Sequence, residues 1–277
     1  MENSLELFTL KGEIAVITGA AGLLGKKHAE AILDADGSVV LIDINEKKLD
    51  ELKEDLCKKY NCENILTLVI DITNENMLSK AKDEIIRRYE KVDILINNAA
   101  NNPSMKDNNG NNETRLENFD LNMWNADVSV GLTGAFLCVK VFGSLMAHNK
   151  KGVIINISSD LGIMAPDQRL YEKDGVENAK QSVKPVTYSV VKSGIIGLTK
   201  YISTYWAENN VRCNAVAFGG VLNNQDENFI EKVNYRIPLG RLADVDEYKG
   251  TILYLCSNAS SYMNGTVLVI DGGRTAW

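Results

Sequence analysis

Short apolar runs recur along the chain and alternate with longer segments in which polar and apolar positions follow a helical period. A glycine, an aspartate or an asparagine follows most of these runs. Continuous apolar runs of this length are typical of strands that are buried on both faces of a parallel sheet. We expect about seven such strands, over Ile14–Thr18, Ser38–Ile42, Leu66–Ile70, Asp93–Ile96, Gly152–Ile157, Val211–Val216 and Val267–Ile270.

The segments between the runs predict the helices of an α/β fold. The clearest are Leu24–Ala35, Glu46–Tyr60, Met77–Tyr89 and Ala135–His148. Regular alternation of strand and helix indicates a doubly wound parallel sheet with helices on both faces and right-handed crossovers. No linker rich in proline, glycine or serine divides the chain, so we expect a single domain over residues 1–277. Ligands of such sheets bind beyond the carboxyl ends of the strands.

Two polar stretches interrupt this alternation. Residues 101–118 are rich in asparagine, and residues 165–186 carry several lysines, an arginine and several carboxylates. Each follows a predicted strand, so both leave the sheet at its ligand-binding edge. Solvated loops and substrate-recognition loops remain equally open as interpretations of both stretches.

Composition narrows the function classes. The chain has 277 residues, of which 45% are hydrophobic and 24% charged, and it has only four prolines. These values predict an ordered globular protein. The net charge of −7, without a basic block or arm, argues against a nucleic-acid partner. The chain shows no signal-like N-terminal segment and no apolar run long enough to span a bilayer, so we expect a cytoplasmic protein without a membrane partner.

Cysteines and histidines predict no metal site. The five cysteines are odd in number and form no CxxC motif. Cys138 and Cys213 lie in apolar surroundings and are interpreted as buried free thiols, while the other three are compatible with core or surface positions. The two histidines, His28 and His148, have no metal-ligand spacing.

A glycine-rich turn joins the first predicted strand to the first helix. Its sequence is Thr18-Gly-Ala-Ala-Gly-Leu-Leu-Gly25. Glycines in this place let the backbone approach a pyrophosphate, which then lies at the helix N-terminus. The turn therefore predicts a dinucleotide-binding site.

Asp43 closes the second strand and predicts which dinucleotide is bound. A carboxylate there can accept hydrogen bonds from both ribose hydroxyls of the adenosine half, but it repels a 2′-phosphate. Neither the glycine turn nor Ile44 supplies a cation for such a phosphate. We expect the cofactor to be NAD.

Tyr188 and Lys192 are four residues apart, which places both side chains on one face of a helix. A phenol titrates near pH 10 in water, and a nearby ammonium group favours the phenolate and lowers this pKa. The pair is a candidate proton-transfer device for interconverting an alcohol and a carbonyl. Taken alone, this spacing favours a surface i,i+4 pair, because Tyr-x-x-x-Lys also arises by chance in many chains.

Further motifs follow in a fixed order, and together with these features they resemble the short-chain dehydrogenase/reductase family. They are Asp71-Ile72-Thr73, Asn97-Asn98-Ala99-Ala100, Ser159 before Tyr188 and Lys192, Ile237–Arg241, and Asp271–Gly273. The resemblance runs from about Lys11 to Gly273. It implies a Rossmann-type fold of the compact, single-domain branch, a nicotinamide cofactor and a homodimer or homotetramer.

The resemblance also assigns roles to single residues. Ser159 hydrogen-bonds the reacting oxygen, with Ser158 as the competing choice; Tyr188 exchanges the hydroxyl proton, and Lys192 holds the nicotinamide ribose. Tyr188 and Lys192 also count among the cofactor contacts. The remaining expected cofactor contacts are Gly19, Gly22, Leu24, Gly25, Asp43, Asp71, Ile72, Asn97, Asn98, Ala99, Gly219, Val221 and Asn223.

Four positions depart from the family pattern. Gly131 stands where an asparagine usually supports a proton relay, so the relay is altered or rebuilt from another group. Phe218 replaces part of a usual Pro-Gly turn, and Asn223 replaces a threonine that meets the nicotinamide amide. The middle glycine of the turn, Gly22, comes one residue early, as in sugar-nucleotide epimerases of the superfamily.

The segment between Ser159 and Tyr188 is longer than is usual in the family, and its extra residues carry cations. Arg169 and Lys173, with Lys180 and Lys184, are candidates to bind a phosphate or another acid. The Asn-rich loop could supply amide contacts to hydroxyls. We expect a polar, sugar-like substrate, phosphorylated or nucleotide-linked. The segment also resembles oxidoreductases of bacterial surface-sugar and flagellin-modification pathways.

Three functions stay open on the sequence. The leading one is an NAD-dependent dehydrogenase acting on a secondary alcohol or ketone. The second is a sugar epimerase whose NAD does not dissociate. The third is a non-catalytic dinucleotide sensor, because Gly131 removes one expected catalytic group.

Overall fold

The computed structural model describes residues 3–101 and 113–277. Seven parallel strands form one sheet in the order β3-β2-β1-β4-β5-β6-β7. The strands are β1 (Ile14–Thr18), β2 (Ser38–Asp43), β3 (Ile65–Val69), β4 (Ile94–Asn97), β5 (Gly152–Ser159), β6 (Val211–Phe218) and β7 (Val267–Ile270). The strand order reverses between β1 and β4, so their carboxyl ends form the crevice where doubly wound sheets bind ligands. The predicted fold class and strand number are confirmed.

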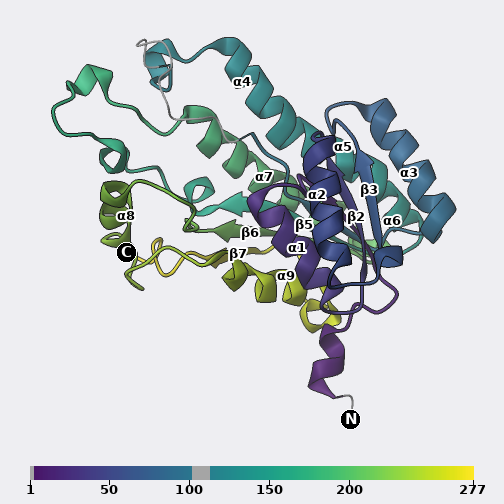
Figure 1. Cartoon of the computed structure of the whole chain (residues 1–277). Helices are drawn as coiled ribbons and strands as arrows, with labels where there is room; N and C mark the ends of the chain where they lie inside the picture. Colours follow the sequence, from purple (N-terminus) through teal and green to yellow (C-terminus); the bar gives the residue numbers. More distant parts are fainter. Residues whose placement is uncertain (1–2, 102–112) are drawn as a thin grey trace.

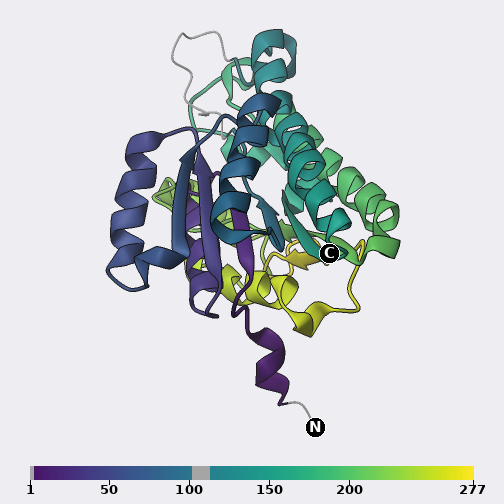
Figure 2. The same cartoon turned by 90° about the vertical axis from the view of Figure 1, so that its right-hand side faces the viewer.

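Helices cover both faces of the sheet (Figures 1 and 2). They are α1 (Leu23–Leu33), α2 (Glu46–Cys57), α3 (Glu75–Tyr89), α4 (Leu121–Val128), α5 (Ala135–Cys138), α6 (Ser144–His148), α7 (Val186–Tyr205), α8 (Glu227–Asn234) and α9 (Lys249–Cys256). Helices α1, α2 and α9 share one apolar core with the sheet. Helices α3, α5, α6 and α7 share the core of the opposite face. Because successive strand residues point to opposite faces, Ile17 packs into the first core and Val16 into the second.

The predicted helix Ala135–His148 is longer than its sequence pattern indicated. α4, α5 and α6 are joined by two π-helical stretches, Ser129–Gly134 and Val139–Gly143, into one continuous helix from Leu121. Asp120 caps its start by accepting hydrogen bonds from the backbone N–H groups of Asn122 and Met123. By length and composition this helix could cross a membrane, but just over half of its most apolar window, 56%, is buried inside the protein. That burial fits a core helix of the domain.

The predicted loops are partly described. Residues 102–112 of the Asn-rich stretch, which was predicted to be a loop, lie outside the described residues. Residues 165–186 contain only short 3₁₀ turns, Gln168–Tyr171 and Asn178–Lys180, and run beside α8 (Figure 1). The stretch is therefore a loop, as predicted.

The cysteines divide into two groups. Cys138 and Cys213 are buried free thiols, as predicted, and Cys256 is a third. Burial raises the pKa of each of these three thiols to about 12, which keeps them protonated. Cys57 and Cys62 form a disulfide, with their Cα atoms 5.0 Å apart. The sequence did not reveal this bridge, because α2 must end at Cys57 and turn back before the two sulfurs meet.

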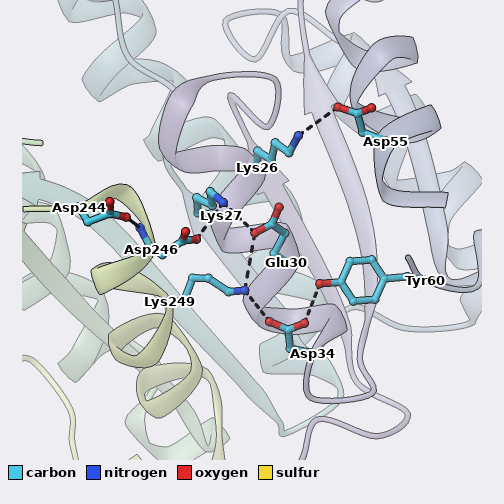
Figure 3. A network of polar contacts seen from close by, with 9 residues as sticks. All are labelled: Lys26, Lys27, Glu30, Asp34, Asp55, Tyr60, Asp244, Asp246 and Lys249. Atoms are coloured by element: carbon cyan, nitrogen blue, oxygen red, sulfur yellow. Dashed lines mark hydrogen bonds and ion pairs between the residues drawn. The ribbon is translucent and has the colours of Figure 1, made fainter. Parts of the chain in front are cut away.

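A network of charges holds α1 against α9 and against the end of α2 (Figure 3). The buried carboxylate of Glu30 lies 3.1 Å from the ammonium of Lys27 and 3.6 Å from that of Lys249. Lys249 also pairs with Asp34 at 2.6 Å, and Asp34 accepts a hydrogen bond from the Tyr60 hydroxyl. These contacts fix the position of α1, whose N-terminus forms part of the ligand-binding crevice.

Candidate active site

Ser159, Tyr188 and Lys192 come together where β5 ends against α7. Ser159 is the last residue of β5, and its hydroxyl donates to Asp160 Oδ1 at 2.8 Å and accepts from the Leu161 N–H at 3.2 Å. Helix α7 begins at Val186 and packs on β5 and β6, so Tyr188 and Lys192 lie in its first two turns. The Lys192 ammonium donates to the carbonyl of Ile157 at 2.9 Å and lies 5.9 Å from the centre of the Tyr188 ring.

Burial sets the acid–base state of this pair. It lowers the pKa of Lys192 to about 8, and the nearby charge of Lys184 adds to the effect. Burial also raises the pKa of Tyr188; Ser159 opposes this rise by a hydrogen bond, and the charge of Asp160 adds to it. The sequence predicted that Lys192 lowers the pKa of Tyr188. In the structure, burial raises this pKa instead. A buried phenol loses the hydration that would stabilise its anion, and one cation near 6 Å does not replace it.

Lys184 is a second cation at the phenol. Its ammonium lies 3.9 Å from the centre of the Tyr188 ring, a cation–π distance. Burial lowers its pKa, and the charge of Asp160 opposes this shift. The sequence placed Lys184 among four possible anion-binding cations, and the tertiary structure brings it to the reacting tyrosine.

The two serines at the end of β5 have different partners. Ser158 donates its hydroxyl to the carbonyl of Lys192 at 2.8 Å and so ties β5 to α7. Ser159 is the serine whose side chain hydrogen-bonds the Tyr188 phenol, which lowers the pKa of that phenol. Behind it, the buried carboxylate of Asp160 pairs with the buried guanidinium of Arg274 at 2.7 Å. Sequence reasoning missed this pair, because the two residues are far apart in the chain.

The glycine turn forms a tight backbone cradle at the start of α1. Gly19 has φ of 62°, and a Cβ there would lie 2.7 Å from the Cα of Ala99. A Cβ on Gly25 would lie 2.3 Å from the carbonyl oxygen of Gly19. Asn98 donates its side-chain amide to the carbonyls of Thr18 and Gly19. The cradle thus depends on glycine and on Asn98, and its open helix N-terminus fits a pyrophosphate.

Gly22 and Leu24 occupy the start of α1: Gly22 is its N-cap residue, and Leu24 lies in its first turn. Asp43 ends β2 beside this turn. Its carboxylate accepts hydrogen bonds from the N–H groups of Ala21 at 3.1 Å and Asn45 at 3.0 Å. A negative charge therefore borders the cradle on the side of β2.

The other predicted cofactor residues lie at the same sheet edge, with one difference. Asp71 follows β3 and accepts hydrogen bonds from the N–H and hydroxyl of Thr73, next to the buried Ile72. Asn97 instead directs its side chain into the sheet, where its amide donates to Asn156 at 2.8 Å. Within the described residues, its buried Oδ1 atom has no hydrogen-bond partner.

The last three predicted cofactor residues follow β6. A Cβ on Gly219 would lie 2.8 Å from the Cα of Asp271. The segment after β6 therefore passes so close to the segment after β7 that only glycine fits at this position. Val221 forms an isolated bridge with Ala243. Asn223 is exposed, and its N–H donates to Gln225.

Arg169 and Lys173 lie away from the tyrosine. The guanidinium of Arg169 binds the carboxylate of Asp167 through two hydrogen bonds, at 2.8 and 2.9 Å, and Arg236 also binds this carboxylate. Arg169 lines an open cleft of about 770 Å³ against α8 rather than the cavity at Tyr188. Lys173 is exposed. The structure does not bring either predicted substrate residue to the Ser159–Tyr188–Lys192 cluster.

Comparisons with known proteins agree with this geometry. A family profile described as enoyl-(acyl carrier protein) reductase matches residues 19–275. The post-translational flagellin modification protein A of Campylobacter coli is 31% identical over 270 residues, covering 95% of this chain and 98% of that protein. The 3-oxoacyl-[acyl-carrier-protein] reductase of Thermotoga maritima is 30% identical over 271 residues, covering 95% and 98%.

A solved structure is also similar over its whole length. The gluconate 5-dehydrogenase from Burkholderia cenocepacia, in complex with NADP and tartrate, superposes with a TM-score of 0.85 at 27% identity, covering 99% of this chain and 100% of that one. The family match, the near-complete coverage and the shared fold identify the chain as an oxidoreductase of the short-chain dehydrogenase/reductase family.

Proposed function

We propose that this protein is a cytoplasmic NAD-dependent dehydrogenase that interconverts a secondary alcohol and a ketone on a sugar-like substrate bearing a negative charge. The convergence of Ser159, Tyr188 and Lys192 at the end of β5 carries the proposal. This cluster supplies a hydroxyl to hold the reacting oxygen, a phenol to exchange its proton and a cation beside the phenol. As in the family generally, we expect the protein to work as a homodimer or homotetramer.

The protein's residues would handle the proton, and the bound nicotinamide would supply hydride exchange. In the direction of oxidation, Tyr188 first gives up its phenol proton, and its phenolate oxygen then takes the alcohol proton as the C–H bond breaks and the carbonyl forms. Ser159 holds the substrate oxygen during this change. Because burial raises the pKa of Tyr188, the phenol is protonated at neutral pH and is ready to act as the acid in ketone reduction.

The glycine cradle and Asp43 support NAD as the cofactor. The cradle is a tight turn at a helix N-terminus, where a pyrophosphate would bind. The turn requires glycine, because a Cβ on Gly19 or Gly25 would collide with the neighbouring backbone. The carboxylate of Asp43 borders the cradle, where it can bind ribose hydroxyls and repel a 2′-phosphate. The similar Burkholderia dehydrogenase was solved with NADP, so the proposal of NAD for this chain rests on Asp43.

Lys184 supports an anionic substrate. Its largely buried ammonium lies over the reacting phenol, where a substrate carboxylate or phosphate near the oxidised carbon would meet it. The similarity to a flagellin-modification protein and to a structure that holds tartrate, a hydroxy acid, favours a polyhydroxylated acid. Arg169 and Lys173 would then contact only a longer substrate that reaches the cleft beside α8.

A substrate panel tests the proposal. Sugar acids, sugar phosphates and nucleotide sugars would be incubated with NAD and with NADP, and the corresponding keto compounds with NADH. We expect net NADH formation with a sugar acid or phosphate and slow turnover with a neutral sugar of the same stereochemistry. Epimerised product without net NADH would instead identify an epimerase. Tight NAD binding without turnover of any compound would identify a sensor.

A further inference from the structure

The position of the usual relay asparagine is closed to any side chain in this protein. Gly131 lies in the π-helical stretch Ser129–Gly134, packed against α7. A Cβ at Gly131 would lie 2.5 Å from Cγ1 of Val191, a distance at which one of the two must move. Val191 therefore fills the space that an asparagine side chain would need. A proton path beside Lys192 must use other groups.

A small cavity lies next to this contact. Its volume is about 10 Å³, which is room for one water molecule. Gly131 and Val191 form part of its wall, and Tyr188 and Lys192 face it as well. The remaining polar side chains on its wall are those of Asn101, Asp127 and Thr187, of which only Asp127 is a carboxylate. One water there would have an ammonium donor and a carboxylate acceptor within the same wall.

Asp127 is the charged side chain that Gly131 leaves at this place. It lies one helical turn before Gly131, on the same face of the composite helix. Its side chain is buried, with 9% exposure, and its Oδ2 accepts a hydrogen bond of 2.5 Å from the hydroxyl of the fully buried Thr187. A buried carboxylate requires several hydrogen-bond partners. Thr187 is one such partner, and a water in the cavity would give the carboxylate a second.

We propose that Asp127, held by Thr187, anchors a water that exchanges protons with Lys192 and so replaces the usual relay asparagine. This inference rests on the proposed function. In alcohol oxidation the Lys192 ammonium passes a proton to the water, and the water releases one toward solvent. Tyr188 then gives its phenol proton to Lys192, and the substrate gives its own proton to the Tyr188 phenolate, so one proton leaves per alcohol oxidised. Asp127 acts as a positioning residue.

Variants at Asp127 distinguish two roles for this residue: holding a relay water, or only linking the composite helix to α7 through Thr187. In Asp127→Ala the anchor is lost, and we expect kcat to fall by about 10-fold or more with KM unchanged, less than the roughly 100-fold or greater loss of a direct acid or base. Asp127→Asn keeps an oxygen that accepts a hydrogen bond from water and should retain most of kcat. Asp83→Ala, an exposed carboxylate on α3, is the control and should behave as wild type.

A rescue variant makes the test specific. Gly131→Asn alone should be destabilised by the clash with Val191, whereas Gly131→Asn combined with Val191→Ala opens the usual relay position. Adding this pair to Asp127→Ala should restore kcat and the shape of its pH profile. The ionisable groups around the cavity are Asp127, Lys192, Lys184 and Tyr188, with Asp160 behind Tyr188, so the profile of each variant must be compared with wild type over the same pH range.

A high-resolution crystal structure gives a readout that needs no substrate. We expect an ordered water between Asp127 and Lys192 in the wild type and its loss in Asp127→Ala. An empty cavity, or a folded Asp127→Ala with unchanged kcat and pH profile, would overturn the inference. If Asp127→Ala does not fold, the same measurements of kcat, pH profile and ordered water are made on Asp127→Asn and Thr187→Val. If the wild type turns over no compound of the panel, the proposed function is wrong. The presence or absence of the ordered water between Asp127 and Lys192 still tests the relay separately.

Discussion

The ammonium of Lys184 lies 3.9 Å from the centre of the Tyr188 ring. Lys184 comes from the charged loop and Tyr188 from the first turn of α7, with Pro185 between them as the N-cap residue of the helix. The contact places a largely buried positive charge against the phenol that exchanges the substrate proton in the proposed reaction. It suggests one experiment on substrate charge.

We predict that Lys184→Met raises KM for anionic substrates by about 10-fold, equal to roughly 1.4 kcal/mol, because the receiving cation is lost. KM for a neutral analogue should change little. Steady-state kinetics on a charged and a neutral sugar of the same stereochemistry measures this difference. Lys180→Met is the matched control, since Lys180 is exposed and paired with Glu177 in the same loop. Equal effects on both substrates would show that Lys184 does not bind the anion.

The charge at Asp43 should determine the cofactor preference. Asp43→Asn keeps an oxygen that can accept the hydrogen bond from Ala21 but removes the charge that repels a 2′-phosphate. We expect NADP to bind about 10-fold more tightly than to the wild type and NAD to bind more weakly. Calorimetric titration with both cofactors measures the change, and Asp50→Asn on the exposed face of α2 is the control. The assignment to NAD is wrong if the unaltered protein binds NADP as tightly as NAD.

Lys192 should cost stability at neutral pH. Its folded pKa, about 8, lies below the ordinary value of 10.5, so the buried charge destabilises the fold at low pH. The cost is fully present below pH 8 and is lost as the pH rises toward 10.5, where the unfolded chain also loses its proton. A shift of this size corresponds to about 3 kcal/mol.

Lys192→Met should therefore be more stable than wild type at pH 7, and the difference should shrink toward pH 10. The gain will be smaller than the full shift, because Lys192 also donates a hydrogen bond to Ile157. Urea unfolding at both pH values measures it, with Lys200→Met, exposed on the same helix, as the control. A variant that is less stable at pH 7 would contradict the prediction.

The buried pair Asp160–Arg274 should hold the serine in place. Arg274→Met leaves the carboxylate of Asp160 buried without its cation, and we expect a loss of about 3–5 kcal/mol in unfolding free energy. Because Asp160 accepts the hydrogen bond of Ser159, kcat should also fall. Arg241→Met breaks an exposed pair with Glu247 and should cost less than about 1 kcal/mol. Equal losses of unfolding free energy in the two variants would show that the buried pair contributes no more than an exposed one.

The strands and the glycine cradle were predictable, because both depend on local sequence. Each buried parallel strand needs a short apolar run. Both ends of every predicted run agree with the observed strand to within two residues. Tyr188 and Lys192 share a helix face because a spacing of four residues requires it. The helix from Leu121 was missed in its first half, since polar residues and two glycines obscure the pattern there while packing on the sheet keeps the helix continuous.

The sequence by itself determined the doubly wound sheet, the glycine turn at α1 and the shared helix face of Tyr188 and Lys192, because each depends on residues close together in the chain. The tertiary structure decided which of the four cations of the loop meets the tyrosine. Asp167 binds Arg169 at the surface, while the partly buried Lys184 lies over the ring. It also decided that Val191 fills the space beside Gly131 and that Asp127 faces Lys192 across a one-water cavity. The pairs Gly131–Val191 and Asp127–Lys192 join segments far apart in sequence, and packing of α7 against the composite helix brings them together.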